Sequence, residues 1–234
     1  MNFHPASPIS VAAFLLIVAV VIAALLVAVR HAYGDDPART RTITFRTTAV
    51  VAAWLGVLAA LIASGKMSAL PLSGLPFFFG SVLVVNLVAG LSHFGGRLAA
   101  GVPTKFLVLF LSFRLPLELV LHSWSQQGTI PTTMTWTGQN WDIVSGIIGL
   151  IAFPLAGRHR GIAWAANLVG FALLLNVIRV AVLSSPLPFG WPVNPPLLLA
   201  LHLPYALIGP VCVGGALLGH LVLTRALLAG TRAR

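Results

Sequence analysis

The sequence predicts an all-α membrane protein, a polytopic bundle of about seven transmembrane helices that forms one integral membrane domain over residues 1–234. Hydrophobic residues make up 58% of the chain and charged residues only 8%, whereas a soluble domain contains roughly 25% charged residues. The mean hydropathy is +0.98. Helices satisfy their own backbone hydrogen bonds, which a bilayer core without water demands. The bilayer itself is therefore the first expected partner.

Seven apolar segments approach the roughly 20 residues that a helix needs to cross a bilayer. The expected spans are residues 9–29, 47–64, 76–93, 104–125, 141–157, 162–184 and 197–224. The first segment is too long for the core of a signal peptide and has no basic residues before it, so we expect a signal anchor. The last contains Pro204 and Pro210. Because proline kinks a helix, we expect a short outer half-helix followed by a full span.

Lysine and arginine alternate between the loops. Eleven of the 14 lie in residues 30–46, 94–105, 158–160 and 225–234, and only Lys66 lies in the other loops. The positive-inside rule then places the N-terminus outside and the C-terminus in the cytoplasm of a bacterial inner membrane. The net charge of +10 therefore reports orientation, and no nucleic-acid partner is expected.

Arg114 and Arg179 are the two basic residues inside predicted spans. A charged side chain at the bilayer centre costs on the order of 2.5–3.5 kcal/mol. We therefore expect both arginines to face the protein interior. Glu118 and Asp142 are the only acids outside the first loop, so the expected pairs are Arg114 with Glu118, and Arg179 with Asp142 or Glu118.

Polar side chains of four predicted spans share one depth in the outer half of the membrane. These candidate ligand-binding residues are Arg114, Glu118, His122, Asn140, Asp142, Ser145, Asn176, Arg179 and His202. We expect no comparable set in the inner half, and we place His220 at the inner surface. Intramembrane ionisable residues mark functional sites by default, whereas polar contacts between helices contribute only roughly 0.6 kcal/mol on average. The sequence therefore predicts an outward-facing pocket for a small polar or anionic ligand or a lipid headgroup, with transport as a variant.

Two chemical alternatives stay open for the same residues. Glu118 and His122 are spaced i, i+4, and with Asp142 and His202 they could supply oxygen and nitrogen ligands to a metal ion. Asp142, Ser145 and His202 could form a hydrolase set, although the chain has no G-x-S-x-G elbow. No cofactor is firmly implied.

The stretch "GGRLAAGVPTKFLVLFLSFRLPLELVLHSWSQQGTIPTTMTWTGQNWDIVSGI" contains an R-x-P-x-E core and a later N-x-D-I motif, and "NVIRVAVLSSPLPFG" follows. These motifs resemble a widespread bacterial family of small multi-pass membrane proteins that has no assigned activity. The resemblance covers roughly residues 76–223. It points to a set of residues that includes Arg114, Pro116, Glu118, Asn140, Asp142 and Gly146. The loop with "WPVNPP" departs from that family, which has a longer aromatic and acidic stretch there.

A fainter resemblance is to the exosortases and archaeosortases, multi-pass enzymes with an extracytoplasmic Cys, Arg and His. The motifs "DIVSGI" and "NVIR" and then His202 occur here in the same order. Val144 stands at the cysteine position, so thiolate catalysis is excluded and Ser145 is the remaining substitute. The resemblance implies a membrane-embedded transferase or peptidase as one alternative. A second alternative is a non-catalytic subunit of a larger membrane assembly. An oligomer is compatible with both alternatives.

Overall fold

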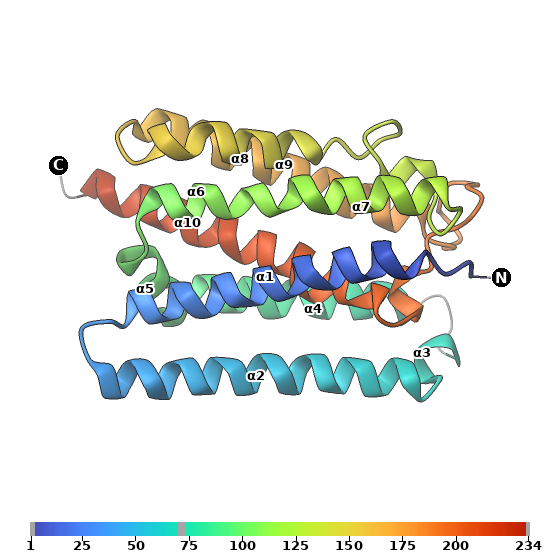
Figure 1. The fold of residues 1–234 in the computed structure, drawn as a ribbon, viewed down its shortest axis with the longest axis horizontal. Helices are drawn as coiled ribbons and strands as arrows, with labels where there is room; N and C mark the ends of the chain where they lie inside the picture. The colour runs from blue at the N-terminus through green and yellow to red at the C-terminus, as the bar shows by residue number, and fades with distance from the viewer. Residues whose placement is uncertain (1–2, 70–73, 233–234) are drawn as a thin grey trace.

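The computed structural model describes residues 3–69 and 74–232, and within these ranges the regular structure is entirely helical. The long helices run roughly along one axis, and the chain begins at one end of the bundle while its last helix finishes at the other (Figure 1). The elements in chain order are α1 (Pro8–Ala32), α2 (Pro37–Ala63), α3 (Lys66–Ala69), α4 (Gly74–Leu91), α5 (His93–Gly101), α6 (Thr104–Phe110), η1 (Leu111–Phe113), α7 (Arg114–Gln126), η2 (Thr132–Met134), α8 (Ile143–Ala156), α9 (Arg160–Ser184), η3 (Leu199–Leu201), η4 (Tyr205–Ile208), η5 (Gly209–Val213) and α10 (Gly214–Arg232).

Five helices among the described residues are long and apolar enough to cross a membrane. They are Pro8–Ala32, Pro37–Ala63, Thr104–Gln126, Arg160–Ser184 and Tyr205–Gly230. A sixth crossing is present if Phe79–Leu91 and His93–Gly101, which are bent by 60° at Ser92, count as one span. Helix α8 has 14 residues, fewer than the roughly 20 that a full crossing needs. The chain is thus a helical bundle of membrane type, and seven spans stay a prediction.

The span predicted over residues 104–125 is confirmed as a helix of membrane length. It contains a tighter 3-10 turn, η1, which lies just before Pro116. Proline has no N–H and its ring displaces the carbonyl four residues earlier, which here belongs to Ser112, inside that turn. Arg114 follows directly, near the middle of the 23-residue helix.

The short half-helix predicted before the last span is instead a series of irregular turns. The 3-10 turns η3 and η4 and the π-turn η5 lead into α10, with Pro204 and Pro210 among them. Helix α10 continues to Arg232, beyond the predicted end at residue 224. The single cysteine, Cys212, is buried in this irregular segment.

Helix α8 packs unusually close to the start of α7, and two glycines permit it. A Cβ atom on Gly146 would lie 2.7 Å from the Cα of Leu115, and one on Gly149 would lie 2.8 Å from the amide nitrogen of Ser112. Small residues at helix interfaces allow this approach in membranes, where packing rather than the hydrophobic effect drives association. The close approach brings the first turn of α8 beside Arg114.

Candidate functional site

Arg114 is the centre of a buried polar cluster that joins α7, α8, α9 and α10. Its Nε donates to Asp142 Oδ2 at 2.5 Å, and its Nη2 forms an ion pair with the other carboxylate oxygen. Its Nη1 donates to Ser145 Oγ and to the Gly170 carbonyl, both at 2.8 Å, and lies 3.2 Å from His220 Nε2. Arg114 is only 1% exposed. The guanidinium fork thus makes a bidentate contact with a carboxylate, the geometry in which arginine binds best.

Glu118 lies one turn along α7 and contacts the same cluster through Asn140. The Asn140 amide donates from Nδ2 to Glu118 Oε1 at 2.7 Å and to the Met134 carbonyl at 3.1 Å. Asn140 Oδ1 accepts from the Asp142 amide at 3.2 Å. Asn140 is fully buried, so this one side chain fixes the loop ahead of α8 against α7. The second oxygen of Glu118, Oε2, is buried and has no hydrogen-bond partner.

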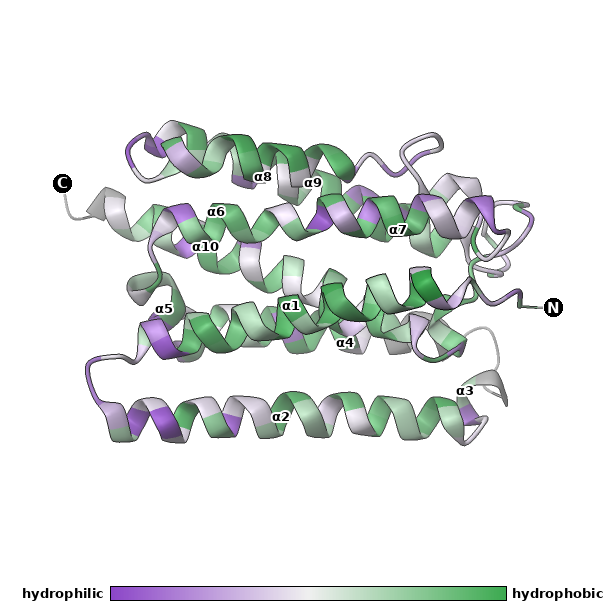
Figure 2. Ribbon diagram, viewed as in Figure 1, coloured by the Kyte–Doolittle hydropathy of each residue, from purple (hydrophilic) through white to green (hydrophobic). Residues whose placement is uncertain are grey.

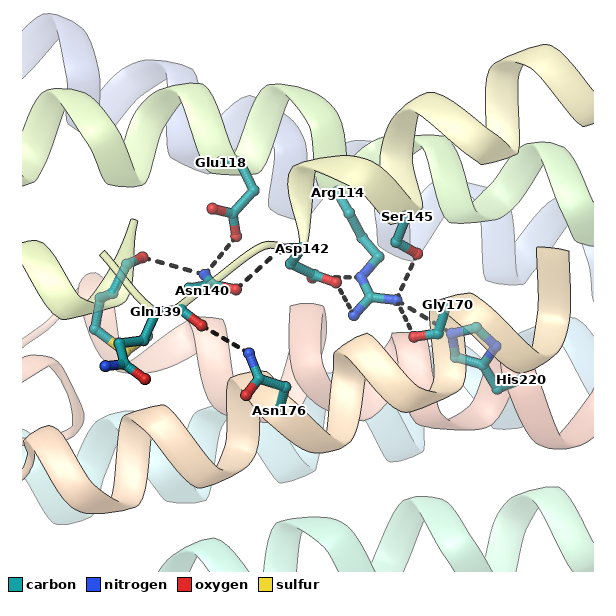
Figure 3. Close-up of polar contacts among 10 residues, drawn as sticks. Arg114, Glu118, Gln139, Asn140, Asp142, Ser145, Gly170, Asn176 and His220 are labelled. Carbon is teal, nitrogen blue, oxygen red and sulfur yellow. Dashed lines mark hydrogen bonds and ion pairs between the residues drawn. The ribbon is translucent and has the colours of Figure 1, made fainter. Parts of the chain in front are cut away.

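A second polar chain continues from Arg114 away from Glu118. His220 Nδ1 lies 2.9 Å from Asn167 Oδ1, and Asn167 Nδ2 donates to Thr224 Oγ1 at 2.7 Å. Thr224 Oγ1 in turn donates to the His220 carbonyl. Arginine can only donate, so His220 Nε2 accepts and its Nδ1 carries the proton. Figure 3 shows the row of polar groups from Gln139 to His220 along the bundle.

These contacts correct four sequence-based expectations. Arg114 is buried as predicted, but its ion partner is Asp142 and not Glu118. Arg179 is exposed, and its guanidinium donates to Asn176 Oδ1 at 2.9 Å and to Gln139 Oε1 at 3.4 Å, so the predicted pair with either acid is wrong. His220 is fully buried and not at the inner surface. The polar set therefore extends past Arg114 into the half of the bundle where none was predicted.

The other predicted site residues lie apart from the buried cluster. Asn176 donates to the Gln139 carbonyl at 2.7 Å, beside the exposed Arg179. The His122 ring stacks on Trp136 with centroids 4.2 Å apart, and the His202 ring stacks on Phe3 at 4.0 Å. Burial lowers the pKa of His202, which lies outside the Tyr205–Gly230 helix. Of the nine candidates, five (Arg114, Glu118, Asn140, Asp142 and Ser145) form the buried cluster.

The residues of the metal-site and hydrolase alternatives do not come together in the structure. Among the described residues, no group of three or more His, Cys, Asp or Glu side chains could hold a metal ion. The set Glu118, His122, Asp142 and His202 is therefore not a metal site in this arrangement. Ser145 Oγ accepts a hydrogen bond from the Arg114 cation, and His202 stacks on Phe3. The Asp142–Ser145–His202 arrangement of a hydrolase is absent.

A cavity of about 90 Å³ adjoins the cluster. Arg114, Glu118 and Asp142 supply its charged wall. The remaining walls are almost entirely apolar and come from α4, α7, α9, α10 and the turns η3 to η5. They include Leu83, Leu174, Ile178, Leu199, Ile208 and Cys212. The site therefore has one polar corner in an otherwise hydrocarbon-like space.

Sequence reasoning missed His220, Asn167 and Thr224. All three lie within largely apolar stretches, Asn167 in α9 and His220 and Thr224 one turn apart in α10, and a polar residue in such a stretch is itself a signal for an interior position. The glycine at position 170 is a weaker sequence signal for this site. A Cβ there would lie 2.8 Å from both Ser145 Oγ and His220 Cε1, so only glycine lets Arg114, Ser145 and His220 meet at this point.

The fold and the site together define a helical protein of membrane type with a buried, charged cluster beside an apolar cavity. No family model matches the chain, and no curated protein or solved structure is significantly similar to it. Both resemblances drawn from the motifs therefore stay predictions.

Proposed function

We propose that the protein is a multi-pass inner-membrane protein that binds a small amphipathic, lipid-like ligand, with the ligand's polar group at Glu118. One observation carries this proposal. Glu118 lines the cavity, and its buried Oε2 has no hydrogen-bond partner. Leaving a buried acceptor unpaired costs on the order of 1–3 kcal/mol. A ligand that donates a hydrogen bond there would recover that free energy.

The charges favour a donor group over an anion. Arg114 is paired with Asp142 at two oxygens, donates to two further acceptors and lies 3.2 Å from His220 Nε2. Its positive charge is therefore already neutralised. Of the two acids in the cluster, Glu118 is the one without an ion pair in the part of the chain that the structure describes. A hydroxyl or ammonium group fits this corner, whereas a phosphate or carboxylate would meet a second carboxyl group.

The shape of the cavity favours a slender, apolar body. A volume of about 90 Å³ is several times the roughly 10–15 Å³ that one water molecule requires. The walls beyond the polar corner are side chains such as Leu174, Ile178 and Leu199. A single hydrocarbon chain fits these apolar walls, because it has no polar groups that would lose hydrogen bonds to water.

The orientation of the site belongs to the same proposal. The distribution of basic residues supports seven spans, with the N-terminus outside and the C-terminus in the cytoplasm. Glu118 lies on the side of Arg114 toward the start of α1, so the cavity would serve the outer half of the membrane. Transport across the membrane would also need a path past His220, Asn167 and Thr224, which are hydrogen-bonded to one another.

Cys212 offers a direct test, because it is the only cysteine and lines the cavity. We would measure the rate at which N-ethylmaleimide labels Cys212 in the purified protein, with dodecylamine, dodecanol or dodecanoate added. We expect the amine and the alcohol to slow labelling and dodecanoate to have little effect. In Glu118→Gln, the amine should lose its advantage over dodecanoate.

Asp35→Asn is the matched control, because Asp35 is a loop acid with a 92% exposed side chain. It should keep the ligand order of the unmodified protein. Dodecanoate protecting Cys212 best in both proteins, or equal protection with and without Glu118, would contradict the proposal.

A further inference from the structure

A second, larger apolar groove follows α1. It has a volume of about 1220 Å³, and its walls come from α1, α2, α4, α5, α6 and α10. Helix α2 lies at the edge of the bundle in Figure 1, and only 11% of its apolar stretch is buried. Side chains such as Val20, Trp54, Leu55 and Phe110 line the groove. It is separate from the cavity beside Glu118.

One end of this groove carries a guanidinium cation and an imidazole ring. His31, in the last turn of α1, and Arg46, on α2, both line it. Neither side chain has a hydrogen bond, ion pair or ring contact with another residue in the part of the chain that the structure describes. Figure 2 shows polar residues gathered where α1 ends and α2 begins, against the apolar length of both helices.

The position of Arg46 along α2 matches the boundary of a bilayer. The 17 residues 47–63 carry no charge, and at 1.5 Å per residue they extend roughly 25 Å. The hydrocarbon core is about 30 Å thick. The residues from Pro8 to Val29 on α1 are likewise uncharged. The uncharged runs thus end at Arg46 on α2 and just before His31 on α1, so both residues lie toward the polar end of the groove, and the groove follows the apolar lengths of the two helices.

Nearby acids do not neutralise this end of the groove. Asp35 lies 3.6 Å from Arg97, and Asp36 caps α2 by accepting from the amides of Ala38 and Arg39. Both carboxylates thus already have partners. The other charged groups near the α1–α2 turn are arginines, including Arg30 on α1 and Arg39 and Arg41 on α2. The excess of positive charge at this end would attract an anion from outside the chain.

We propose that this groove is a binding site for an anionic phospholipid, with the phosphate at His31 and Arg46 and an acyl chain along α1. A guanidinium binds phosphate through charge-assisted hydrogen bonds. Basic pockets between membrane helices recognise anionic headgroups in this way. The apolar walls exclude a polar occupant, and the charge selects an anionic lipid over a neutral one.

Native mass spectrometry of the full chain, titrated with dioleoyl phosphatidylglycerol or dioleoyl phosphatidylcholine, tests the proposal. We expect phosphatidylglycerol to bind more tightly to the unmodified protein. Arg46→Gln should weaken that binding about fivefold, the effect of one basic residue near a membrane surface. Arg46→Lys should retain most of it. Arg41→Gln is the matched control, because Arg41 lies on the same helix outside the groove, and it should bind like the unmodified protein.

A second pair of variants tests the acyl-chain part without changing charge. Val20→Trp should fill the groove and reduce binding of both lipids, whereas Leu168→Trp, at an exposed position of α9, should not. Thermal melting of each variant would exclude unfolding as the cause. Equal loss in Arg46→Gln and Arg41→Gln, equal affinity for the two lipids, or a dimer whose interface fills the groove would each overturn the proposal.

Discussion

Neutralising Asp142 should destabilise the protein far more than neutralising an acid at its surface. Asp142→Asn would leave Arg114 charged at a position where it is 1% exposed. Removing one partner of a buried ion pair costs about 3–5 kcal/mol. Arg114→Gln should be at least as severe, because Asp142 and Glu118 would then face each other without a cation. The double variant Arg114→Met/Asp142→Leu should recover much of the loss, since a buried ion pair replaced by apolar residues of similar volume is often nearly neutral.

The chain contains its own control pair. Asp35 and Arg97 are 3.6 Å apart, with side chains 92% and 33% exposed. Exposed pairs of this kind contribute about 0–1 kcal/mol, so Asp35→Asn should have little effect. Reversible unfolding by detergent titration in bicelles, followed by circular dichroism, would give the free energies. Equal costs for the Asp142 and Asp35 variants, or single costs that add fully in the double variant, would refute the buried, coupled pair.

Two further predictions concern packing around the cluster. Gly146→Ala should lower the free energy of unfolding and displace α8, because its Cβ would meet the backbone of Leu115. Gly56→Ala, whose Cβ meets nothing within 4 Å, should be neutral or stabilising by up to about 1 kcal/mol. The same unfolding titration compares the two variants, and equal effects would contradict close α7–α8 packing. His220→Ala should loosen the Arg114 side chain and weaken amine protection of Cys212, while His220→Gln, which keeps an acceptor, should restore part of it. Unchanged labelling kinetics in His220→Ala would contradict a positioning role.

The position of Arg114 could be predicted from sequence because the physical constraint is severe. It lies about 15 Å from one end and about 18 Å from the other end of a 23-residue helix. No arginine side chain reaches the membrane boundary from there, so an interior position with a partner is required. The choice between Glu118 and Asp142 as that partner was not determined by sequence. Residues four apart on one helix can pair, but the close approach of α8 at Gly146 gives Asp142 the better bidentate geometry.

Arg179 shows why the same reasoning fails near a helix end. It lies five residues before the end of α9 at Ser184, roughly 8 Å along the axis. A long side chain can extend from there to the boundary while its methylenes stay in apolar surroundings. The guanidinium accordingly lies over the Trp191 ring at 5.5 Å and is exposed. Burial and an ion partner are therefore unnecessary at this depth.

The predicted depth of His220 is wrong because the predicted last span begins and ends too early in the sequence. A span over residues 197–224 puts His220 one turn from its inner end. The irregular turns before Gly214 shift the regular helix onward, to Arg232, so His220 lies in its interior. Two prolines in the sequence indicate that a break exists. Helix α10 packs mainly on α4, α5 and α9, and the local sequence does not contain such contacts between distant segments.

The hydrogen bonds of the cluster indicate different roles for Arg114 and Glu118. Every nitrogen of the Arg114 guanidinium already contacts Asp142, Ser145, Gly170 or His220. A ligand could engage Arg114 only by breaking these contacts, and each is buried. Glu118, by contrast, lines the cavity and has one oxygen held by Asn140, while the other oxygen is buried without a hydrogen-bond partner. Variants of Arg114 should therefore affect folding first, whereas Glu118→Gln should affect ligand choice in a protein that still folds.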